Sequence, residues 1–321
     1  MGDPAGIGPE IILKLLRRPA GMPDRPLVVV GDRPCMEAAA TRMGGRFTLP
    51  EWNPMHALPA RGAVFCQATK PSRRPVPAPG KCGAASGRLA ADAILTAAAL
   101  CNGGLVAGMV TAPVNKEALR RAGVPFPGHT EWLAQLSGSR SCAMLFAGER
   151  LKVVLATIHL PLAEVPKRLT AARIVEVTAL AHAALVHDFG IRRPRIAVAG
   201  LNPHAGEHGL LGREDARVVA PAVRRARSAG MEVSGPYPGD TVFRRALEGE
   251  FHLVVGLYHD QGLGPIKTLE GFRAVNVTLG LPWVRTSVDH GTAEDIAGRG
   301  VASSEGLRAA VRLAAMMAGR R

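Results

Sequence analysis

Three histidines follow predicted strands in the same way, and together they could hold a metal ion. His159 ends VVLATIHL, His204 ends AVAGLNPH, and His259 lies in GLYHDQG. Each follows, by a few residues or less, an apolar run that predicts a buried strand. Because the carboxyl ends of parallel strands lie along one edge of a sheet, the three imidazoles could converge on a catalytic divalent ion such as zinc. A histidine at a strand end is also commonly a hydrogen-bonded turn residue, so the spacing alone leaves both alternatives open.

Polar residues are also concentrated in the stretch from Phe251 to Ala297. The apolar run 253–257 predicts a buried strand that leads residues 258–261 into a glycine-broken turn. Ionisable and polar residues then follow at the ends of further short apolar runs: Lys267, Asn276, Arg285, Asp289 and His290. A lysine and an arginine beside an asparagine suit carboxylate and phosphate binding, while surface cations or a structural salt bridge are the alternatives. No G-x-S-x-G elbow occurs, which disfavours a Ser-His-Asp hydrolase.

Two loops could bind anions at a helix N-terminus. The loop 2–10, GDPAGIGPE, precedes a helical pattern, although a tight turn with Pro9 at the first helical position explains it equally. Thr130 is expected to cap the following helix, which would leave His129 on the loop, for anion binding or merely exposed. The segment 289–298 is expected to be a small-residue loop that runs into a helix.

The remaining pattern predicts an α/β protein with short connections. Buried strands are expected near 27–31, 62–67, 105–111, 142–146, 151–158 and 195–199, with a hairpin turn at Gly148. Helices are expected near 11–16, 34–43, 84–100 and 171–189, then before 229 and from about 241. Irregular loops are expected in the Pro-rich stretch 48–83. The length of 321 residues favours two lobes, and the lack of a linker suggests that they interleave along the chain.

The formal net charge of +14 has two explanations. Clustered Lys and Arg would indicate a nucleic-acid binder, but here the cations are mostly dispersed arginines, without an RNA-binding aromatic motif or zinc-finger spacing. A basic surface also favours a small anionic substrate. Five cysteines without a CxxC pair indicate reduced thiols. No apolar run approaches the roughly 18 residues that span a bilayer, and no signal-peptide layout is present, so a cytoplasmic location is expected.

Six motifs, in order over essentially the whole chain, resemble one family. They are GDPAGIGPE at Gly2, TAPVNK at Thr111, GHTE at Gly128, NPHAGE at Asn202, GPYPGDT at Gly235 and YHDQG…VRTSVDHGTAEDIAG from Tyr258. Together they closely resemble the 4-hydroxythreonine-4-phosphate dehydrogenases, NAD-dependent enzymes of pyridoxal 5'-phosphate biosynthesis. The last motif also resembles the cofactor loop of isopropylmalate and isocitrate dehydrogenases, whose fold the family shares.

The resemblance implies a two-lobed α/β/α sandwich of the isocitrate/isopropylmalate dehydrogenase type, with the active site in the interlobe cleft at a homodimer interface. Residues 1–120 and 265–321 would form a first lobe with the cofactor loop. Residues 121–264 would form a second lobe with the metal ligands and the dimer contacts. Family members usually have a short strand before the first motif, where Met1 stands here. Either the start codon is assigned late or the sheet lacks a strand.

The resemblance also assigns roles to residues. It implies that the divalent ion, zinc, magnesium or cobalt, is held by His159, His204 and His259, with the site shared between the two subunits. It assigns substrate binding to His129, Thr130, Lys267, Asn276 and Arg285. Contacts with NAD or NADP would come from His290, Gly291, Thr292, Ala293, Asp295 and Ile296. Lys267 is also a catalytic candidate, and Asp240 is a hypothesis for proton transfer.

The implied reaction is oxidation of 4-phosphohydroxy-L-threonine at C3, followed by loss of CO2. A paralogue acting on 4-phospho-D-threonate or 4-phospho-D-erythronate is the alternative within the family. A branch that oxidises dihydrodiol dicarboxylates fits less well, because the phosphate-type residue set is complete. A basic nucleic-acid-binding protein is the alternative from another class.

Overall fold

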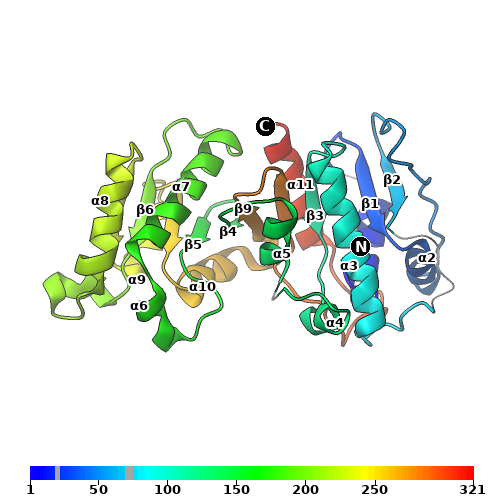
Figure 1. Cartoon of the computed structure of the whole chain (residues 1–321), viewed down its shortest axis with the longest axis horizontal. Coiled ribbons are helices and arrows are strands. Elements are labelled where there is room, and N and C mark those ends of the chain that lie inside the picture. The colour runs from blue at the N-terminus through cyan, green and yellow to red at the C-terminus, as the bar shows by residue number, and fades with distance from the viewer. Residues whose placement is uncertain (19–21, 69–74, 127) are drawn as a thin grey trace. The chain divides into compact units, whose positions relative to one another are not determined.

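The computed structural model describes residues 1–18, 22–68, 75–126 and 128–321, and the chain divides into two compact units (Figure 1). Unit 1 comprises Met1–Ser139 and Leu281–Ala318, and unit 2 comprises Arg140–Gly280 and Gly319–Arg321. Both units combine strands with helices, which confirms the α/β class. The boundaries fall later in the chain than the expected 120/121 and 264/265. Part of the Pro-rich stretch, residues 69–74, lies outside the described residues.

Unit 1 contains two pairs of parallel strands. The strands are β1 (Leu27–Gly31), β2 (Ala63–Gln67), β3 (Gly108–Thr111) and β10 (Val284–Ser287). The helices are α1 (Gly8–Arg17), α2 (Arg33–Arg42), α3 (Ala84–Asn102), α4 (Lys116–Arg121), α5 (His129–Leu136) and α11 (Glu305–Ala318). β1 pairs with β2 and β3 pairs with β10. Helix α5 belongs to this unit because it packs on α3, and Asn102 donates a hydrogen bond to the carbonyl of Leu136.

Helices cover both faces of the β1–β2 pair. On one face, Val30 and Cys66 pack against α3 residues such as Leu100. On the other face, Phe65 packs with Ile11 of α1 and with α2. A strand with helices on both faces needs a continuous apolar run rather than alternation, and LVVVG in β1 is such a run, with Val30 and Gly31 buried and residues 27–29 partly buried.

Unit 2 contains six neighbouring strands in the order β9-β4-β5-β8-β6-β7. They are β4 (Ala143–Ala147), β5 (Lys152–Leu155), β6 (Ile196–Ala199), β7 (Val233–Tyr237), β8 (Leu253–Gly256) and β9 (Val275–Leu279). β4 is antiparallel to both β5 and β9, which confirms the expected hairpin, while β5, β8, β6 and β7 run parallel. All four residues of β6 and of β8 are buried, as central parallel strands require.

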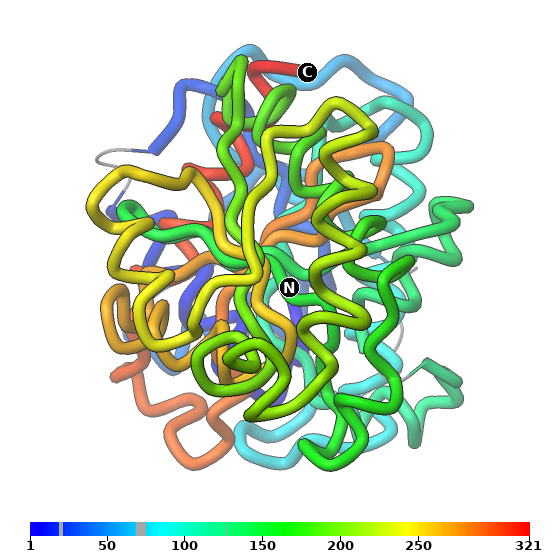
Figure 2. The backbone as a smooth tube through the Cα atoms, turned by 90° about the vertical axis from the view of Figure 1, so that its left-hand side faces the viewer, coloured from blue at the N-terminus to red at the C-terminus, as the bar shows by residue number. Residues whose placement is uncertain are grey.

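The helices of unit 2 follow these strands and can be traced in green through orange in Figure 2. They are α6 (Val165–Arg168), α7 (Ala171–His187), α8 (Ala220–Ser228), α9 (Gly239–Leu247) and α10 (His259–Glu270). Short helical turns occur at Leu162–Glu164, Pro203–Gly209 and Gly271–Arg273, and a π-helical turn at Asp215–Val219 precedes α8. Thr170 caps α7 by accepting a hydrogen bond from the N–H of Arg173, an interaction worth about 1 kcal/mol.

Three expectations about local structure were wrong. Residues 259–261 are the first turn of helix α10 rather than a glycine-broken turn, so Lys267 lies on a helix. Asn276 and Arg285 lie inside strands β9 and β10 rather than at their ends. No helix follows the 289–298 loop directly: residues 294–298 form turns, and α11 begins at residue 305.

Helix α3 is more apolar than expected, since the sequence analysis found no apolar run long enough to span a bilayer. Among the described residues, this one unbroken helix is long and apolar enough to cross a membrane by length and composition, with 56% of its most apolar window buried. Core helices pass the same test, and α3 packs against β1, β3 and α4 inside unit 1.

Candidate active site

The strand ends that carry the three histidines are adjacent in unit 2, and side chains connect them. β5, β8 and β6 are parallel neighbours, in that order. The hydroxyl of Thr157 donates to the carbonyl of Leu257 at 2.7 Å, which joins the ends of β5 and β8. Gln261 accepts from the N–H of Leu257 at 2.7 Å and donates to the carbonyl of Gly200 at 2.6 Å, which joins the ends of β8 and β6. The three histidines therefore follow parallel strands at one edge of a sheet, as expected, and these strands are neighbours.

Two of the three histidines lie next to each other. The ring centroids of His159 and His259 are 5.7 Å apart. A 2.7 Å hydrogen bond joins Nδ1 of His259 to the carboxylate of Asp260, which leaves the other ring nitrogen for a ligand. His204 is exposed on the turn after β6. Within the described part of the chain, no set of three or more His, Cys, Asp or Glu side chains is close enough to hold a metal ion.

The turn that carries His204 is held by a buried carboxylate. Residues 204–208 all have positive φ angles, between 41° and 81°, a conformation that costs non-glycine residues energy. Asp215, in the π-helical turn, accepts hydrogen bonds from the N–H groups of Leu201 at 2.7 Å and Asn202 at 3.0 Å. It also accepts one from the Asn202 side chain at 3.0 Å. This network fixes the start of the unusual turn, and π-helical turns are frequent at functional sites.

The sequence predicted that Thr130 caps the helix and that His129 lies on the loop before it. This prediction was wrong, because His129 lies on the helix itself. Gly128 is the N-cap of α5, and both His129 and Thr130 lie in the first helical turn. Gly128 adopts an extended conformation, and its carbonyl accepts the hydrogen bond from Trp132. Nε2 of His129 is buried and has no hydrogen-bond partner among the described residues. A buried polar atom without a partner is costly unless a ligand or water satisfies it.

Positive charges surround His129 in unit 1. Burial, with the nearby charges of Arg285, the Met1 amino group and Lys116, lowers the pKa of His129 to about 3. Arg285 is itself buried, and it donates a 2.8 Å hydrogen bond to the hydroxyl of Thr111. Burial lowers the pKa of Arg285 to about 10, so it remains a cation at neutral pH. A neutral imidazole near the buried cation Arg285 and the exposed cation Lys116 is in an environment that favours an anion.

The remaining predicted substrate and proton-transfer residues lie in unit 2. Asn276 pairs with Phe146 of β4, and its Oδ1 is buried without a hydrogen-bond partner among the described residues. Lys267 is exposed on α10, and Asp240 is exposed in the first turn of α9. Asn276 and His129 are thus two predicted substrate residues that each present a buried, unsatisfied atom.

The predicted cofactor loop packs against the glycine loop at the start of the chain. The N–H of Ile7 donates to the carbonyl of Thr292 at 3.0 Å. A Cβ on Gly6 would come within 2.8 Å of Cβ of Thr292, so this contact needs a glycine. Thr292 is buried, Ala293 has a φ of 44°, and Gly291 and Asp295 are exposed.

Comparison with known proteins identifies the family. Residues 23–314 match the family described as pyridoxal phosphate biosynthetic protein PdxA. The chain is 47% identical to a 4-hydroxythreonine-4-phosphate dehydrogenase from Beijerinckia indica, over 97% of this chain and 91% of the relative. The chain belongs to this family. It is accordingly an enzyme, and specifically a dehydrogenase.

Other similar proteins include relatives and solved structures whose names give different substrates. A relative from Bradyrhizobium diazoefficiens, 43% identical over 99% of this chain and 95% of its own length, is provisionally named D-threonate 4-phosphate dehydrogenase. The solved structure of 4-hydroxythreonine-4-phosphate dehydrogenase from Klebsiella pneumoniae superposes with a TM-score of 0.88 at 43% identity, covering 99% of this chain and 98% of that one. A terephthalate 1,2-cis-dihydrodiol dehydrogenase from Burkholderia xenovorans gives 0.68 at 29% identity, covering 99% and 96%.

Three positioning residues were not recognised in the sequence: Thr157, Asp215 and Gln261. Gln261 stood in the YHDQG motif, but its contact with Gly200 spans 61 positions. Asp215 lies 13 positions beyond Asn202 and outside every recognised motif. For Gln261 and Asp215, the sequence shows only that each lies near a predicted metal-ligand histidine. That proximity does not predict which backbone groups their side chains bind.

Proposed function

We propose that the chain oxidises 4-phosphohydroxy-L-threonine with NAD and releases CO2 to give 3-amino-2-oxopropyl phosphate, a step in pyridoxal 5'-phosphate biosynthesis. The observation that carries this proposal is the buried, unsatisfied Nε2 of His129 in its cationic surroundings. The names of the 43–47% identical relatives supply the substrate class.

The phosphate would be held at the N-terminus of α5. His129 and Thr130 lie in its first turn, where free backbone N–H groups and the helix dipole favour an anion. Arg285 adds a buried charge and Lys116 a further positive one. A guanidinium suits phosphate because its donors match the oxygen geometry in pairs.

Asn276, Lys267 and Asp240 are the candidates for binding the hydroxy-acid end and for proton transfer. Oδ1 of Asn276 is an acceptor that lacks a donor among the described residues, and the substrate's amino or hydroxyl group could supply one. Lys267 would bind the carboxylate or take part in proton transfer, and Asp240 is the second proton-transfer candidate. The proposed oxidation removes a hydride from C3 and a proton from its hydroxyl, which gives a β-keto acid, and bound NAD would supply the hydride acceptor. The C1–C2 bond then breaks, CO2 leaves, and C2 is protonated.

The donor chemistry of the histidine region fits a divalent ion. His159, His204 and His259 would be the ligands, and imidazoles favour zinc or cobalt over magnesium, which prefers oxygen. The hydrogen bond from His259 to Asp260 is the kind of contact that orients a ligating ring. When bound, the ion would polarise the C3 hydroxyl and stabilise negative charge during oxidation and decarboxylation. We also propose a cytoplasmic homodimer whose subunits share the metal site.

NAD or NADP would be bound by His290, Gly291, Thr292, Ala293, Asp295 and Ile296. The close contact between Gly6 and Thr292 supports this assignment, because it fixes the loop in one conformation. A preorganised loop binds its ligand without an ordering cost.

A side-by-side assay tests the proposal. NADH formation would be measured with 4-phosphohydroxy-L-threonine and with 4-phospho-D-threonate, before and after chelation and after zinc or cobalt is restored. We expect the amino acid to be oxidised with the higher kcat/KM and chelation to abolish activity reversibly. A higher kcat/KM with 4-phospho-D-threonate would instead support the second candidate, which the Bradyrhizobium relative favours. Salt-dependent nucleic-acid binding with no NADH from either substrate would refute both.

A further inference from the structure

Three segments of unit 1 meet at the proposed cofactor loop, and hydrogen bonds join each pair of them. They are the glycine loop 2–7, the connection 112–115 between β3 and α4, and the cofactor loop 290–297. The N–H of Asp3 donates to the carbonyl of Pro113 at 2.9 Å, which joins the first segment to the second. The N–H of Ile7 donates to the carbonyl of Thr292 at 3.0 Å, which joins the first to the third. Side chains join the remaining pair.

Asn115 and Glu294 link the β3–α4 connection to the cofactor loop. Nδ2 of Asn115 donates to the carboxylate of Glu294, and the hydroxyl of Thr292 donates to the same carboxylate oxygen at 3.3 Å. Oδ1 of Asn115 accepts from the N–H of Ala118 at 2.8 Å, as the N-cap of α4. The cap decides which way the amide faces, because only its oxygen can accept from a backbone N–H. The amide nitrogen is therefore directed at Glu294.

Glu294 also stabilises a strained residue of the loop. Ala293 has a φ of 44°, a conformation that costs a non-glycine residue energy. Its two neighbours, Thr292 and Glu294, are joined by the hydroxyl–carboxylate hydrogen bond. This bond closes the turn around Ala293, so loss of the carboxylate contacts should change the conformation of the loop.

Gly80 and Cys82 hold Glu294 from a further segment. A Cβ on Gly80 would lie 2.8 Å from the carbonyl oxygen of Glu294, and the N–H of Gly80 donates to the carbonyl of Ala5 at 2.7 Å. The thiol of Cys82 is hydrogen-bonded to the carboxyl groups of Asp3 and Glu294. Burial and these two carboxyl groups raise the pKa of Cys82, so the thiol keeps its proton and can donate it. Glu294 is thus held by segments that are distant in the sequence.

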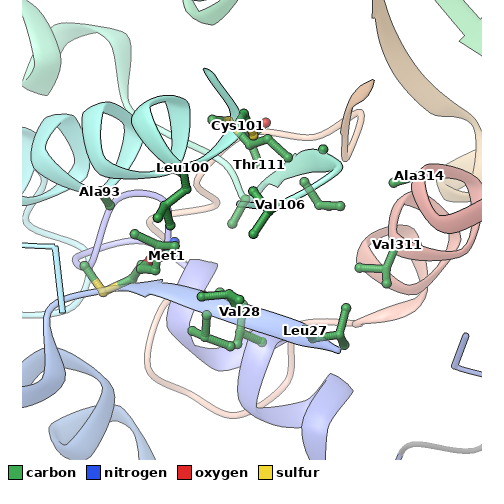
Figure 3. Close-up of a pocket in the computed structure, with 18 of the residues that line it drawn as sticks. Met1, Leu27, Val28, Ala93, Leu100, Cys101, Val106, Thr111, Val311 and Ala314 are labelled. Carbon is green, nitrogen blue, oxygen red and sulfur yellow. The ribbon is translucent and has the colours of Figure 1, made fainter. Parts of the chain in front are cut away.

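The connection that holds Glu294 begins beside the proposed phosphate site. β3 ends at Thr111, shortly before Asn115. The hydroxyl of Thr111 accepts a 2.8 Å hydrogen bond from Arg285, and Figure 3 shows Thr111 across an apolar cavity from Val28 of β1. One short segment therefore positions both the cation proposed to bind the phosphate and the carboxylate of the cofactor loop.

We propose that Glu294 is a positioning residue for the cofactor: held by Asn115, its carboxylate fixes the 290–297 loop in the conformation that binds NAD. This inference rests on the proposed cofactor loop. A loop that is already ordered binds its ligand without the cost of ordering, and hydrogen bonds to an ionised group are stronger than those between neutral groups. Because Glu294 acts through the loop, loss of its contact with Asn115 should weaken NAD binding with little effect on the chemical step.

An exchange of the two partners tests the proposal. Asn115→Asp keeps an oxygen that caps α4, because Asp is also a preferred N-cap, but it replaces the amide donor with a second carboxylate beside Glu294. We expect the Kd for NADH, measured by quenching of tryptophan fluorescence at pH 8, to rise at least about tenfold. At saturating NAD, kcat should stay within about threefold of the wild type, since the chemical step is not altered.

Adding Glu294→Gln to Asn115→Asp restores a donor opposite an acceptor and returns the net charge to that of the wild type. The Kd for NADH of this double variant should therefore lie within about threefold of the wild-type value. Hydrogen exchange of the peptides that cover 290–297 should follow the same order, fast in Asn115→Asp and slow again in the double variant. A double variant that keeps the wild-type Tm without recovering NADH binding would overturn the proposal.

Asn53→Asp is the matched control for Asn115→Asp. Asn53 is an exposed residue of the same unit whose Oδ1 also accepts from a backbone N–H, that of Met55. The control adds the same negative charge and should leave the Kd for NADH unchanged. An equal rise in Kd for both variants would assign the effect to charge alone and would overturn the proposal.

The same measurements separate this inference from the proposed function. If the wild-type chain binds NADH and Asn115→Asp binds it equally well, Glu294 does not position the cofactor, while the proposed oxidation with NAD stands. A wild-type chain that binds neither NADH nor NADPH would refute the proposed cofactor loop, and the role of Glu294 with it.

Discussion

The side chain of Gln261 donates a 2.6 Å hydrogen bond to the carbonyl of Gly200. The same side chain accepts a hydrogen bond from the N–H of Leu257. Because Gly200 directly follows β6 and Leu257 directly follows β8, one amide group sets the spacing between the strand ends that precede His204 and His259. Neither histidine needs to contact the other for their positions to be coupled.

Replacement of Gln261 by Met should weaken metal binding. Met has a similar length but cannot make either hydrogen bond, so the two strand ends lose their link. We expect zinc or cobalt affinity to fall about 10- to 100-fold, as for other residues that orient metal ligands, measured by isothermal titration calorimetry. Asp188→Asn is the control, since it weakens the ion pair between the buried Asp188 and the partly exposed Arg321 in the same unit. Equal loss of affinity in both variants would mean that general destabilisation, not ligand positioning, is responsible.

Replacement of Gly6 by Ala should weaken cofactor binding. The new Cβ would lie 2.8 Å from Cβ of Thr292 and 3.0 Å from its carbonyl oxygen, so the 290–297 loop must shift. We expect the KM for NAD to rise about tenfold and the free energy of unfolding to fall by about 1–3 kcal/mol.

The matched control for Gly6 is Gly264→Ala. Gly264 lies within α10, and a Cβ added there would meet no described atom within 4 Å beyond its own helix. Alanine there should leave the KM for NAD unchanged and stabilise the helix by up to about 1 kcal/mol. A normal KM for NAD in Gly6→Ala, with reduced stability, would remove the 290–297 loop from the cofactor site.

The strands were predictable because their apolar runs are local signals. LVVVG at 27–31 and the hairpin pair at 143–155 follow directly from them. Helix α10 was not predictable, because Gly262, Gly264 and Pro265 argue against a helix. Gly262 has a tertiary reason: a Cβ there would lie 2.5 Å from Leu155 and 2.8 Å from Val153. The helix can lie against β5 only if that position has no side chain.

The candidate site also contains features that could be predicted from the sequence and features that could not. The histidine positions were predictable, since strand ends can be identified from the sequence. The left-handed turn at 204–208 was not, because four of its five residues are not glycine and no local rule predicts positive φ there. Its stabilisation depends on Asp215, whose hydrogen bonds to residues 201 and 202 exist only in the folded chain.

Replacement of Arg285 by Met should weaken substrate binding. Arg285 is the buried cation beside His129 and is held by Thr111, and loss of a buried charge partner costs about 2–5 kcal/mol. We expect kcat/KM for the phosphorylated substrate to fall at least about 100-fold, with Arg285→Lys restoring part of it. The control is the exposed Arg193→Met, which makes the same change in net charge. A similar loss in both variants would assign the effect to the overall positive field rather than to a phosphate contact.

The lowered pKa of His129 should appear in the stability of unit 1. The unfolded chain binds a proton below the ordinary pKa of 6.5, whereas the folded chain does so only near pH 3. The free energy of unfolding is therefore not reduced by this histidine above pH 6.5. It decreases as the pH falls from 6.5 toward 3, because only the unfolded chain gains the proton. The slope between these values is at most about 1.4 kcal/mol per pH unit.

His129→Gln removes this titration and should flatten the stability curve between pH 6.5 and pH 4. Urea unfolding followed by tryptophan fluorescence can measure the difference, because Trp52, Trp132 and Trp283 all lie in unit 1. The Met1 amino group, whose pKa is also lowered by burial, is present in both proteins and cancels in the comparison. His56→Gln, at an exposed histidine of the same unit, controls for general effects of the substitution. If His129→Gln kept the wild-type slope, the imidazole would not be buried in neutral form, and the anion site around it would need another donor.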